Sequence, residues 1–331
     1  MKMIHLRLAV LAGAFGLLLA IPLLAFHLRT TFLQGWYQSL SIGGWWIVSP
    51  LEGLESILVS RRLHAPLVVG MLTPVVVALL LGRVFCSWLC PIQLFTEVGK
   101  RLTAPLRRGA GLPERLRLPR RILWFALAAE VILALVLGSP LFVFLSPPGL
   151  VGRELMMAVF FGTLALEGVL VLGVVTLNLF SRHFFCRYLC PLGGLLALLG
   201  GRRSLRVERE AATCSACGRC DRACPLALTA SGGEGLSPYC WNCGDCVDAC
   251  GTKALRFSWK TPGRRTPFSF LRPDEPGGYS LKEEKQNEEK SSSMDHAVTA
   301  SGPAGRSGGR NRNLHHQGAK NHPRGGDPVP L

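Results

Sequence analysis

Charged residues are scarce in this chain. Asp, Glu, Lys and Arg make up 18% of its 331 residues, whereas apolar residues make up 49%. The shortage is greatest for acids, with 21 Asp and Glu against 37 Lys and Arg and a net charge of +16. So little charge beside so much apolar mass excludes a purely soluble enzyme and a disordered chain. The twelve cysteines then indicate a membrane protein that carries a cysteine-rich module.

Several motifs are also absent. No C-x-x-C-H occurs, which excludes c-type haem attachment. No G-x-x-x-x-G-K-[S/T] occurs, which excludes nucleotide-driven transport. All eight histidines lie outside the long apolar stretches, which argues against a haem held by two histidines within a membrane. No twin-arginine signal precedes the first apolar stretch, as we expect for a metal-loaded module that stays in the cytoplasm.

Four apolar stretches are long enough to cross about 30 Å of hydrocarbon, which takes roughly 20 helical residues. They are 8–26, 66–85, 122–145 and 155–180. No small-x-small cleavage site follows the first, so we expect an uncleaved anchor. Sixteen Lys and Arg flank the stretches on the side of the N-terminus and four on the other side, which predicts that both termini are cytoplasmic. The basic charge then reports topology and contact with anionic membrane lipid, not nucleic acid.

The chain repeats itself with a period of about 100 residues. Ser49-Pro50 precedes the second apolar stretch and Ser146-Pro147 precedes the fourth. A C-x-x-x-C-P motif follows each, at 86–91 and 186–191. Each half holds two spans, so the halves share one orientation, as in transporters with parallel repeats. We therefore predict that residues 1–201 are an all-α polytopic membrane domain of four transmembrane helices in two parallel repeats, with both motifs at the cytoplasmic surface.

The character of the chain changes after Gly201. Residues 202–258 form a cysteine-rich module, and residues 259–331 are rich in Gly, Ser, Pro and mixed charge. Such a stretch cannot bury enough apolar surface to offset its chain entropy, so we expect a disordered cytoplasmic tail. The pair His315-His316 follows from the composition of this tail.

The module contains two runs of the form C-x2-C-x2-C-x3-C, which is the bacterial ferredoxin pattern for two [4Fe–4S] clusters. Three closely spaced thiolates wrap one cubane, and the fourth reaches the other. The predicted ligands are Cys214, Cys217, Cys220 and Cys250 for one cluster and Cys240, Cys243, Cys246 and Cys224 for the second. Structural zinc would use two CxxC pairs for each ion and fits less well. We expect a small α+β fold in which 205–207 and 254–257 pair as strands and the clusters are cytoplasmic.

The remaining cysteines, Cys86, Cys90, Cys186 and Cys190, admit three interpretations. They could supply four thiolates to a third redox centre. They could form a thiol/disulfide pair in each half, because positions i and i+4 share one helix face. They could also be packing residues, since cysteine is often buried. The duplicated frame favours a redox role over packing.

Two acids fall within the predicted spans. Glu130 and Glu167 would each cost roughly 2.5–3.5 kcal/mol as charges at the bilayer centre, so each is a candidate functional group. They could accept protons during quinol oxidation, or they could be protonated and hydrogen-bonded between helices. Four aromatic residues are typical of an interfacial belt, namely Trp36, Tyr37, Trp45 and Trp46.

Residues 1–258 resemble the NapH-type membrane ferredoxins, the quinol dehydrogenase membrane component associated with periplasmic nitrate reduction. They equally resemble the methylamine-utilisation MauN-like ferredoxin-type proteins. The resemblance implies location in the bacterial inner membrane and electron transfer from the quinone pool, through iron–sulfur centres, to a partner oxidoreductase. That partner would be a second ferredoxin-type or periplasmic redox subunit. The alternative function is a redox-sensing or maturation factor for a partner respiratory enzyme.

Overall fold

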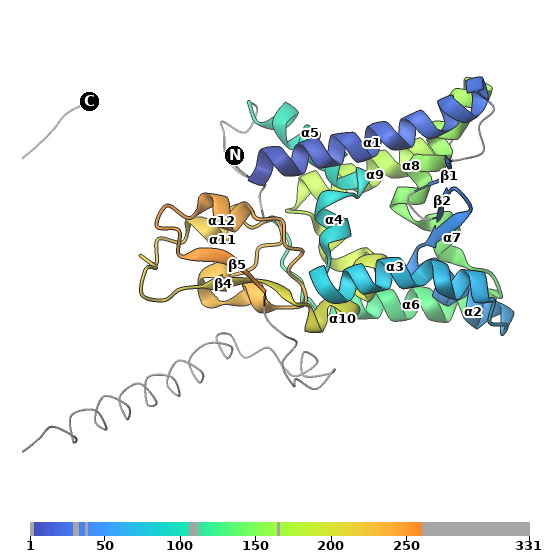
Figure 1. Cartoon of the computed structure of the whole chain (residues 1–331). Coiled ribbons are helices and arrows are strands. Elements are labelled where there is room, and N and C mark those ends of the chain that lie inside the picture. Colours follow the sequence, from blue (N-terminus) through green and yellow to red (C-terminus); the bar gives the residue numbers. More distant parts are fainter. Residues whose placement is uncertain are drawn as a thin grey trace, which may run out of the picture. The chain divides into compact units, whose positions relative to one another are not determined.

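Long apolar helices dominate the N-terminal part of the chain, as the hydropathy pattern predicts. The computed structural model describes residues 3–28, 33–36, 39–105, 112, 114–163 and 166–259, and all of them belong to one compact unit (Figure 1). The expected tail, with His315 and His316, lies outside these residues except for Trp259.

Four apolar helices correspond to the four expected spans. They are α1 (Met3–Leu28), α3 (Ala65–Leu81), α6 (Ile122–Leu137) and α9 (Leu166–Phe180). Among the described residues, one helix is long and apolar enough to cross a membrane, within Met3–Leu23 of α1. The other three are 17, 16 and 15 residues long.

The third and fourth stretches are not continuous helices, contrary to the prediction. Gly138 ends α6 with φ of 65°, and the short α7 (Leu141–Leu145) follows Pro140. In the fourth stretch, α8 (Pro147–Met156) continues into a π-helical turn that Gly162 ends with φ of 64°. A left-handed residue cannot continue a right-handed helix, and glycine adopts it without strain.

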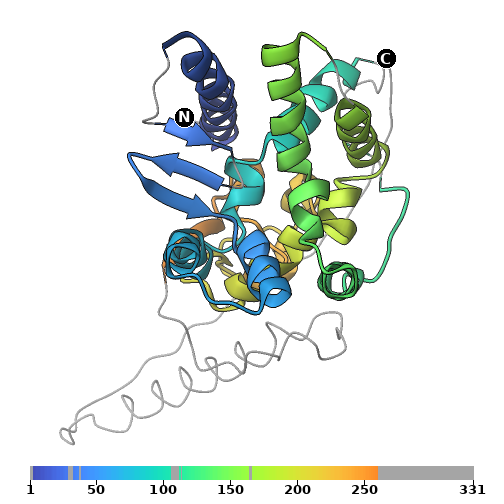
Figure 2. The same ribbon diagram turned by 90° about the vertical axis from the view of Figure 1, so that its right-hand side faces the viewer.

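The expected all-α character of residues 1–201 is wrong between positions 33 and 48. Strands β1 (Leu33–Gly35), β2 (Ser39–Ile42) and β3 (Trp45–Val48) form an antiparallel sheet. Gly43 and Gly44, with φ of 58° and 89°, close the β2–β3 hairpin. Two positive φ values in a two-residue loop are typical of type I′ hairpin turns. Figure 2 shows this sheet between α1 and α3, both of which it contacts.

The duplicated motifs lead into corresponding elements. Ser49 and Ser146 are the N-cap residues of α2 (Pro50–Ser60) and α8. Each C-x-x-x-C-P motif begins in a short helical segment. The first motif begins in α4 (Val84–Trp88) and the second in the segment Phe185–Leu189. The motif proline then begins a helix, α5 (Pro91–Thr103) or α10 (Pro191–Leu199). Proline suits the first helical position because that N–H has no helical partner. The transmembrane repeat itself stays a prediction.

The cysteine-rich module is a small α+β unit. Strands β4 (Leu205–Arg209) and β5 (Leu255–Trp259) pair antiparallel, with Val207 opposite Phe257. This pairing confirms the expected strands. Between them lie α11 (Arg219–Ala223) and α12 (Asp245–Ala249), which contact each other.

The module is attached closely to the ends of the apolar helices. At the end of α3, the Leu80 carbonyl accepts from the Ser204 N–H at 3.0 Å, and the Leu81 carbonyl accepts from the Asn242 amide at 2.8 Å. At the start of α1, buried Arg7 donates to Asp245 of α12 at 2.6 Å. The N-terminal end of α1 and the module therefore lie at the same end of the helices (Figure 1).

Candidate metal centres

The structure gathers the module's eight cysteines around two cavities. One cavity is lined by Cys214, Cys217, Cys220 and Cys250. The other is lined by Cys224, Cys240, Cys243 and Cys246. The fourth cysteine of each run thus lies with the first three of the other run, which is the grouping that the spacing predicts.

Left-handed residues bend both cysteine runs in the same way. Ala216 and Gly218 flank Cys217 with φ of 51° and 67°, and Asn242 and Gly244 flank Cys243 with φ of 52° and 84°. Alternating right- and left-handed backbone curls each loop, so that its three cysteines face one cavity. This backbone conformation explains Gly218, Gly244 and Asn242, because glycine and asparagine adopt positive φ most readily.

The donor groups fit an iron–sulfur cluster. All twelve cysteines are free of disulfides, and neither cavity is lined by Asp, Glu or His. Thiolates are the ligands that [4Fe–4S] clusters use. Among the described residues, no three His, Cys, Asp or Glu side chains lie close enough together to hold a single metal ion. This is compatible with a cluster, because four thiolates that bind four different iron atoms lie further apart than four thiolates that bind one ion.

The two cavities differ in depth. In the first set Cys217 is exposed and Cys214 and Cys250 are half-buried, whereas all four cysteines of the second set are buried. Three of the second set, Cys224, Cys240 and Cys243, belong to a buried group against which Cys86, Trp124 and Cys186 of the helical part pack. The first set therefore faces the surface and the second faces the helices.

The first C-x-x-x-C-P motif is bonded directly to the loop that carries the second set. Arg83 donates to the Tyr239 carbonyl at 3.2 Å and Ser87 to the Trp241 carbonyl at 2.7 Å. The Trp88 indole donates to the Asn242 carbonyl at 3.2 Å. Ser87 and Trp88 inside the motif and Arg83 just before it therefore position the module, a role that sequence reasoning missed.

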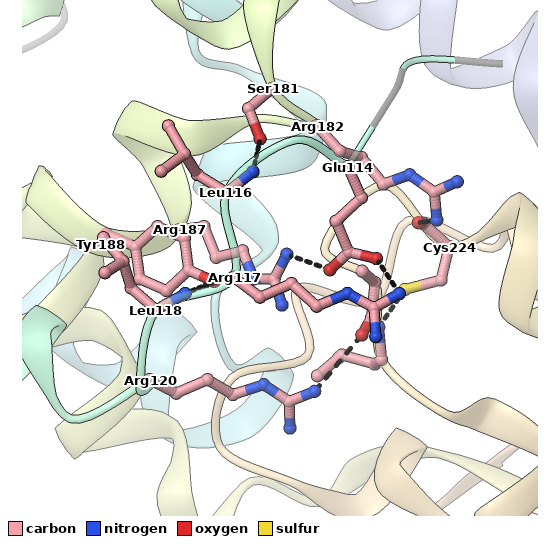
Figure 3. Close-up of polar contacts among 12 residues, drawn as sticks. Glu114, Leu116, Arg117, Leu118, Arg120, Ser181, Arg182, Arg187, Tyr188 and Cys224 are labelled. Carbon is pink, nitrogen blue, oxygen red and sulfur yellow. Dashed lines mark hydrogen bonds and ion pairs between the residues drawn. The ribbon is translucent and has the colours of Figure 1, made fainter.

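The variable residues of the second motif hold a different segment (Figure 3). Arg187 bonds to Glu114 at 2.9 Å, and the Tyr188 hydroxyl accepts from the Leu118 N–H at 3.1 Å. Residues 114–120 connect this motif to the module, because Arg120 donates to the Ala227 carbonyl at 3.2 Å. Burial alone would raise the pKa of Glu114, but the hydrogen bond and the charge of Arg187 lower it below its usual value.

The four motif cysteines lie close together. Cys86 and Cys186 occupy the short helical segments, and Cys90 and Cys190 are the N-cap residues of α5 and α10. Burial raises the pKa of Cys90, and the other three thiols raise it further. Burial likewise raises the pKa of Cys190 to about 12, with Cys86 adding to the effect.

The two predicted intramembrane acids have different environments. Glu167 lies in the first turn of α9 and pairs with Arg153 of α8 at 2.9 Å, a partner not anticipated from the sequence. Glu130 lies in α6 with one buried carboxyl oxygen that has no hydrogen-bond partner among the described residues. Two further acids of α2 went unnoticed in the sequence, half-buried Glu52 and buried Glu55. Burial and then Glu55 raise the pKa of Glu52 to about 7.

An apolar cavity of about 330 Å³ lies between α1, the sheet, α3, α4 and α10. Ala14, Leu18 and Val77 are among its lining residues, and Phe85 and Leu89 line it beside Cys86 and Cys90. Neither Glu130 nor Glu167 is among them. Of the expected aromatic belt, Trp36 lines the cavity, Trp45 and Trp46 are exposed, and Tyr37 lies outside the described residues.

Comparison with known proteins gives a family match to two segments that lie almost entirely in the helical part. Residues 63–113 and 156–208 match a family described as 4Fe-4S binding domain. These segments carry the two C-x-x-x-C-P motifs, and both end before the eight cysteines of the module.

Three relatives illustrate the similarity. The putative electron transport protein YccM of Escherichia coli is 32% identical over 67% of this chain and 64% of its own length. The ferredoxin-type protein NapH of Escherichia coli is 29% identical over 62% of this chain and 72% of its own. The methylamine utilization ferredoxin-type protein MauN of Paracoccus denitrificans is 33% identical over 58% and 66%. The match thus spans just under two thirds of YccM. No solved structure matches the chain.

Proposed function

We propose that this chain, which is similar to the ferredoxin-type proteins NapH and MauN, is an iron–sulfur electron-transfer protein and the quinol-oxidising membrane subunit of an electron-transfer chain. Oxidation of one quinol to quinone releases two protons and two electrons. The electrons pass singly to a partner oxidoreductase, a second ferredoxin-type or periplasmic redox subunit.

The exposed surface of the apolar helices supports a location in the membrane. Large apolar side chains are exposed on all four, with Leu17 of α1, Leu72 of α3, Val136 of α6 and Val169 of α9 between 50% and 75% exposed. Soluble proteins seldom expose apolar surface of this extent. We propose that α1, α3, α6 and α9 are the transmembrane helices of a multi-pass inner-membrane protein, with the module in the cytoplasm.

The apolar cavity carries the proposal for quinol. Its lining is almost entirely apolar, as an isoprenoid chain requires. Phe85 and Leu89, which line the cavity, are the chain neighbours of Cys86 and Cys90, and Cys86 packs against the group that holds cysteines of the buried second set. A quinol ring held there would therefore lie on the side of the helices that faces the metal centres. Because Glu130 and Glu167 do not line this cavity, they are not placed at the quinol.

The module's eight cysteines would hold two [4Fe–4S] clusters, each of which carries one electron at a time when bound. The protein determines where the two sets of cysteines lie. Bonds from Arg83, Ser87 and Trp88 hold the second set against the helices, whereas Cys217 brings the first set to the surface. A partner would therefore accept electrons at the exposed set.

A cavity-filling variant tests the function. Ala14→Phe adds a ring to the wall of the cavity, and Ala12→Phe adds the same ring on the exposed face of the same helix. The full chain, purified anaerobically in detergent, would be mixed with a short-chain quinol and cluster reduction followed by low-temperature EPR. We expect at least tenfold slower reduction for Ala14→Phe and the wild-type rate for Ala12→Phe.

Two results would contradict the proposal. If quinol leaves the clusters of the wild-type chain oxidised, the protein is not a quinol dehydrogenase, and the redox-sensing or maturation function takes precedence. If both variants reduce at the wild-type rate, quinol does not enter this cavity.

A further inference from the structure

The cysteines of the two C-x-x-x-C-P motifs are not used by the function proposed above. We propose that Cys86, Cys90, Cys186 and Cys190 together hold one further iron–sulfur cluster, shared between the two halves of the chain. This inference goes beyond quinol oxidation and stands without it, because it concerns what the four thiols bind rather than what donates electrons.

The two motifs bring their thiols to one place. Cys86 and Cys186 both pack against one buried apolar group, which includes Cys224, Cys240 and Cys243 of the module. Cys86 and Cys190 both pack against a second group, which includes Phe142 and Leu196. Cys86, Cys186 and Cys190 each lie close enough to Cys90 to act on it electrostatically. Two thiols from each half therefore converge, and four is the number of ligands that such a cluster needs.

Nitrogen donors point at the sulfur atoms. The Asn178 amide donates to Cys186 Sγ at 3.4 Å, and the Gly193 N–H donates to Cys190 Sγ at 3.4 Å. The Arg83 guanidinium, 2% exposed, lies beside Cys86 and donates to the Cys186 carbonyl at 3.2 Å. Hydrogen bonds to sulfur and a nearby positive charge stabilise a thiolate-bound cluster. A purely apolar packing role would use neither.

The Arg83 guanidinium occupies the space beside Gly193, where any larger side chain would collide with it. A Cβ on Gly193 would lie 2.7 Å from Arg83 Nη2 and 3.5 Å from Cys190 Cβ. The glycine thus lets a cation from the first half reach the motif of the second half. This contact joins the two halves at the proposed site.

The family match supports one shared site. The two segments that resemble 4Fe-4S binding domains contain two cysteines each, Cys86 and Cys90 in one and Cys186 and Cys190 in the other. Neither segment can supply four thiolates alone. A cluster on these segments therefore requires both, which is the arrangement that the structure shows.

The position of the site suggests its use. It lies between the apolar cavity, through Phe85 and Leu89, and the buried cysteine set of the module, through the packing of Cys86 and Cys186. A redox centre here would connect the two.

The test counts iron and acid-labile sulfide in the full chain after anaerobic reconstitution with ferrous iron and sulfide. Two [4Fe–4S] clusters give about eight iron atoms per chain, and the further cluster raises this to about ten or about twelve, for two or four irons. The double variant Cys86→Ser with Cys186→Ser should fall to about eight. The control Leu89→Ser with Leu189→Ser, which changes the same position of each motif, should keep the wild-type count.

About eight iron atoms in the reconstituted wild-type chain would overturn the proposal, and this measurement does not depend on whether any variant folds. An unchanged count in the cysteine double variant would also overturn it. Neither result bears on the reaction with quinol. Conversely, a full iron count in a chain that quinol fails to reduce would refute the proposed function and leave this site intact.

Discussion

Asn178 shows how one buried polar residue ties the two halves together. Its side-chain oxygen accepts from the Phe185 N–H at 3.0 Å, and its amide donates to Thr96 Oγ1 and Cys186 Sγ, each at 3.4 Å. Thr96 lies in the helix that follows the first motif. In the sequence Asn178 is one polar residue in an apolar stretch, and only the fold reveals that it binds the backbone of the second motif.

Cys224 provides the sharpest test of the cluster assignment. Its side chain lines the cavity of the second set, although its run supplies the first. Cys224→Ser should therefore damage the second cluster more than the first, and the matched change Cys217→Ser should do the reverse. EPR of the reduced chains, with iron counts, separates the two. If each run held its own cluster, both variants would affect the same one.

Glu52 predicts a dependence of stability on pH. Burial and Glu55 raise its pKa from 4.5 to about 7. Between these values the folded chain keeps a proton that the unfolded chain releases, so stability is highest below about pH 4.5 and falls as the pH rises to about 7. In Glu52→Gln this fall should be smaller. Thermal unfolding in detergent at about pH 5 and about pH 8 measures it, and an equal fall in both proteins would contradict the prediction.

At the scale of elements, patterns within the cysteine-rich module predicted its structure correctly, whereas breaks in the long helices and contacts between helices were not predicted. The cysteine spacing and the β-prone segments at 205–207 and 254–257 lie within one module, so the sequence alone predicted their pairing. The breaks at Gly138 and Gly162 were missed because hydropathy averages over single glycines. The hairpin at Gly43-Gly44 was missed although two consecutive glycines before β-prone residues are a turn signal. The Arg153–Glu167 pair joins two helices and has no signature in the sequence.

The contact between the end of α3 and the end of α10 depends on two glycines, Gly82 and Gly200. A Cβ on Gly200 would lie 2.8 Å from the Cα of Gly82, and backbone cannot yield as a side chain can. Gly200→Ala should therefore lower the free energy of unfolding by about 1–3 kcal/mol. Gly201→Ala is the matched control, because no atom lies within 4 Å of its added Cβ. Chemical unfolding in detergent compares the two variants, and equal stabilities would show that the close approach of Gly82 and Gly200 does not stabilise the fold.

At the scale of the molecule, the contacts place the candidate centres in one order. The apolar cavity adjoins the first motif, both motifs pack against the buried cysteine set, and the other set reaches the surface. Three arginines hold the module in this position. Arg7, Arg83 and Arg120 each bond it to a different part of the helical region. Sequence reasoning assigned the basic charge to topology and to contact with anionic lipid, whereas these three residues hold the module in position.

The same contacts make the proposed topology testable at two points. Leu63, which is 78% exposed between α2 and α3, should lie outside the cytoplasm, and Trp259, at the end of the module, should lie inside. Alkaline phosphatase, active only when exported, should be active when fused after Leu63 and inactive after Trp259. A green fluorescent protein fusion, fluorescent only in the cytoplasm, should give the opposite pattern. Because Arg7 and Arg120 bind the module to the N-terminal helix and to the segment before α6, the reverse result would place both basic segments outside and would contradict the charge bias from which the orientation was predicted.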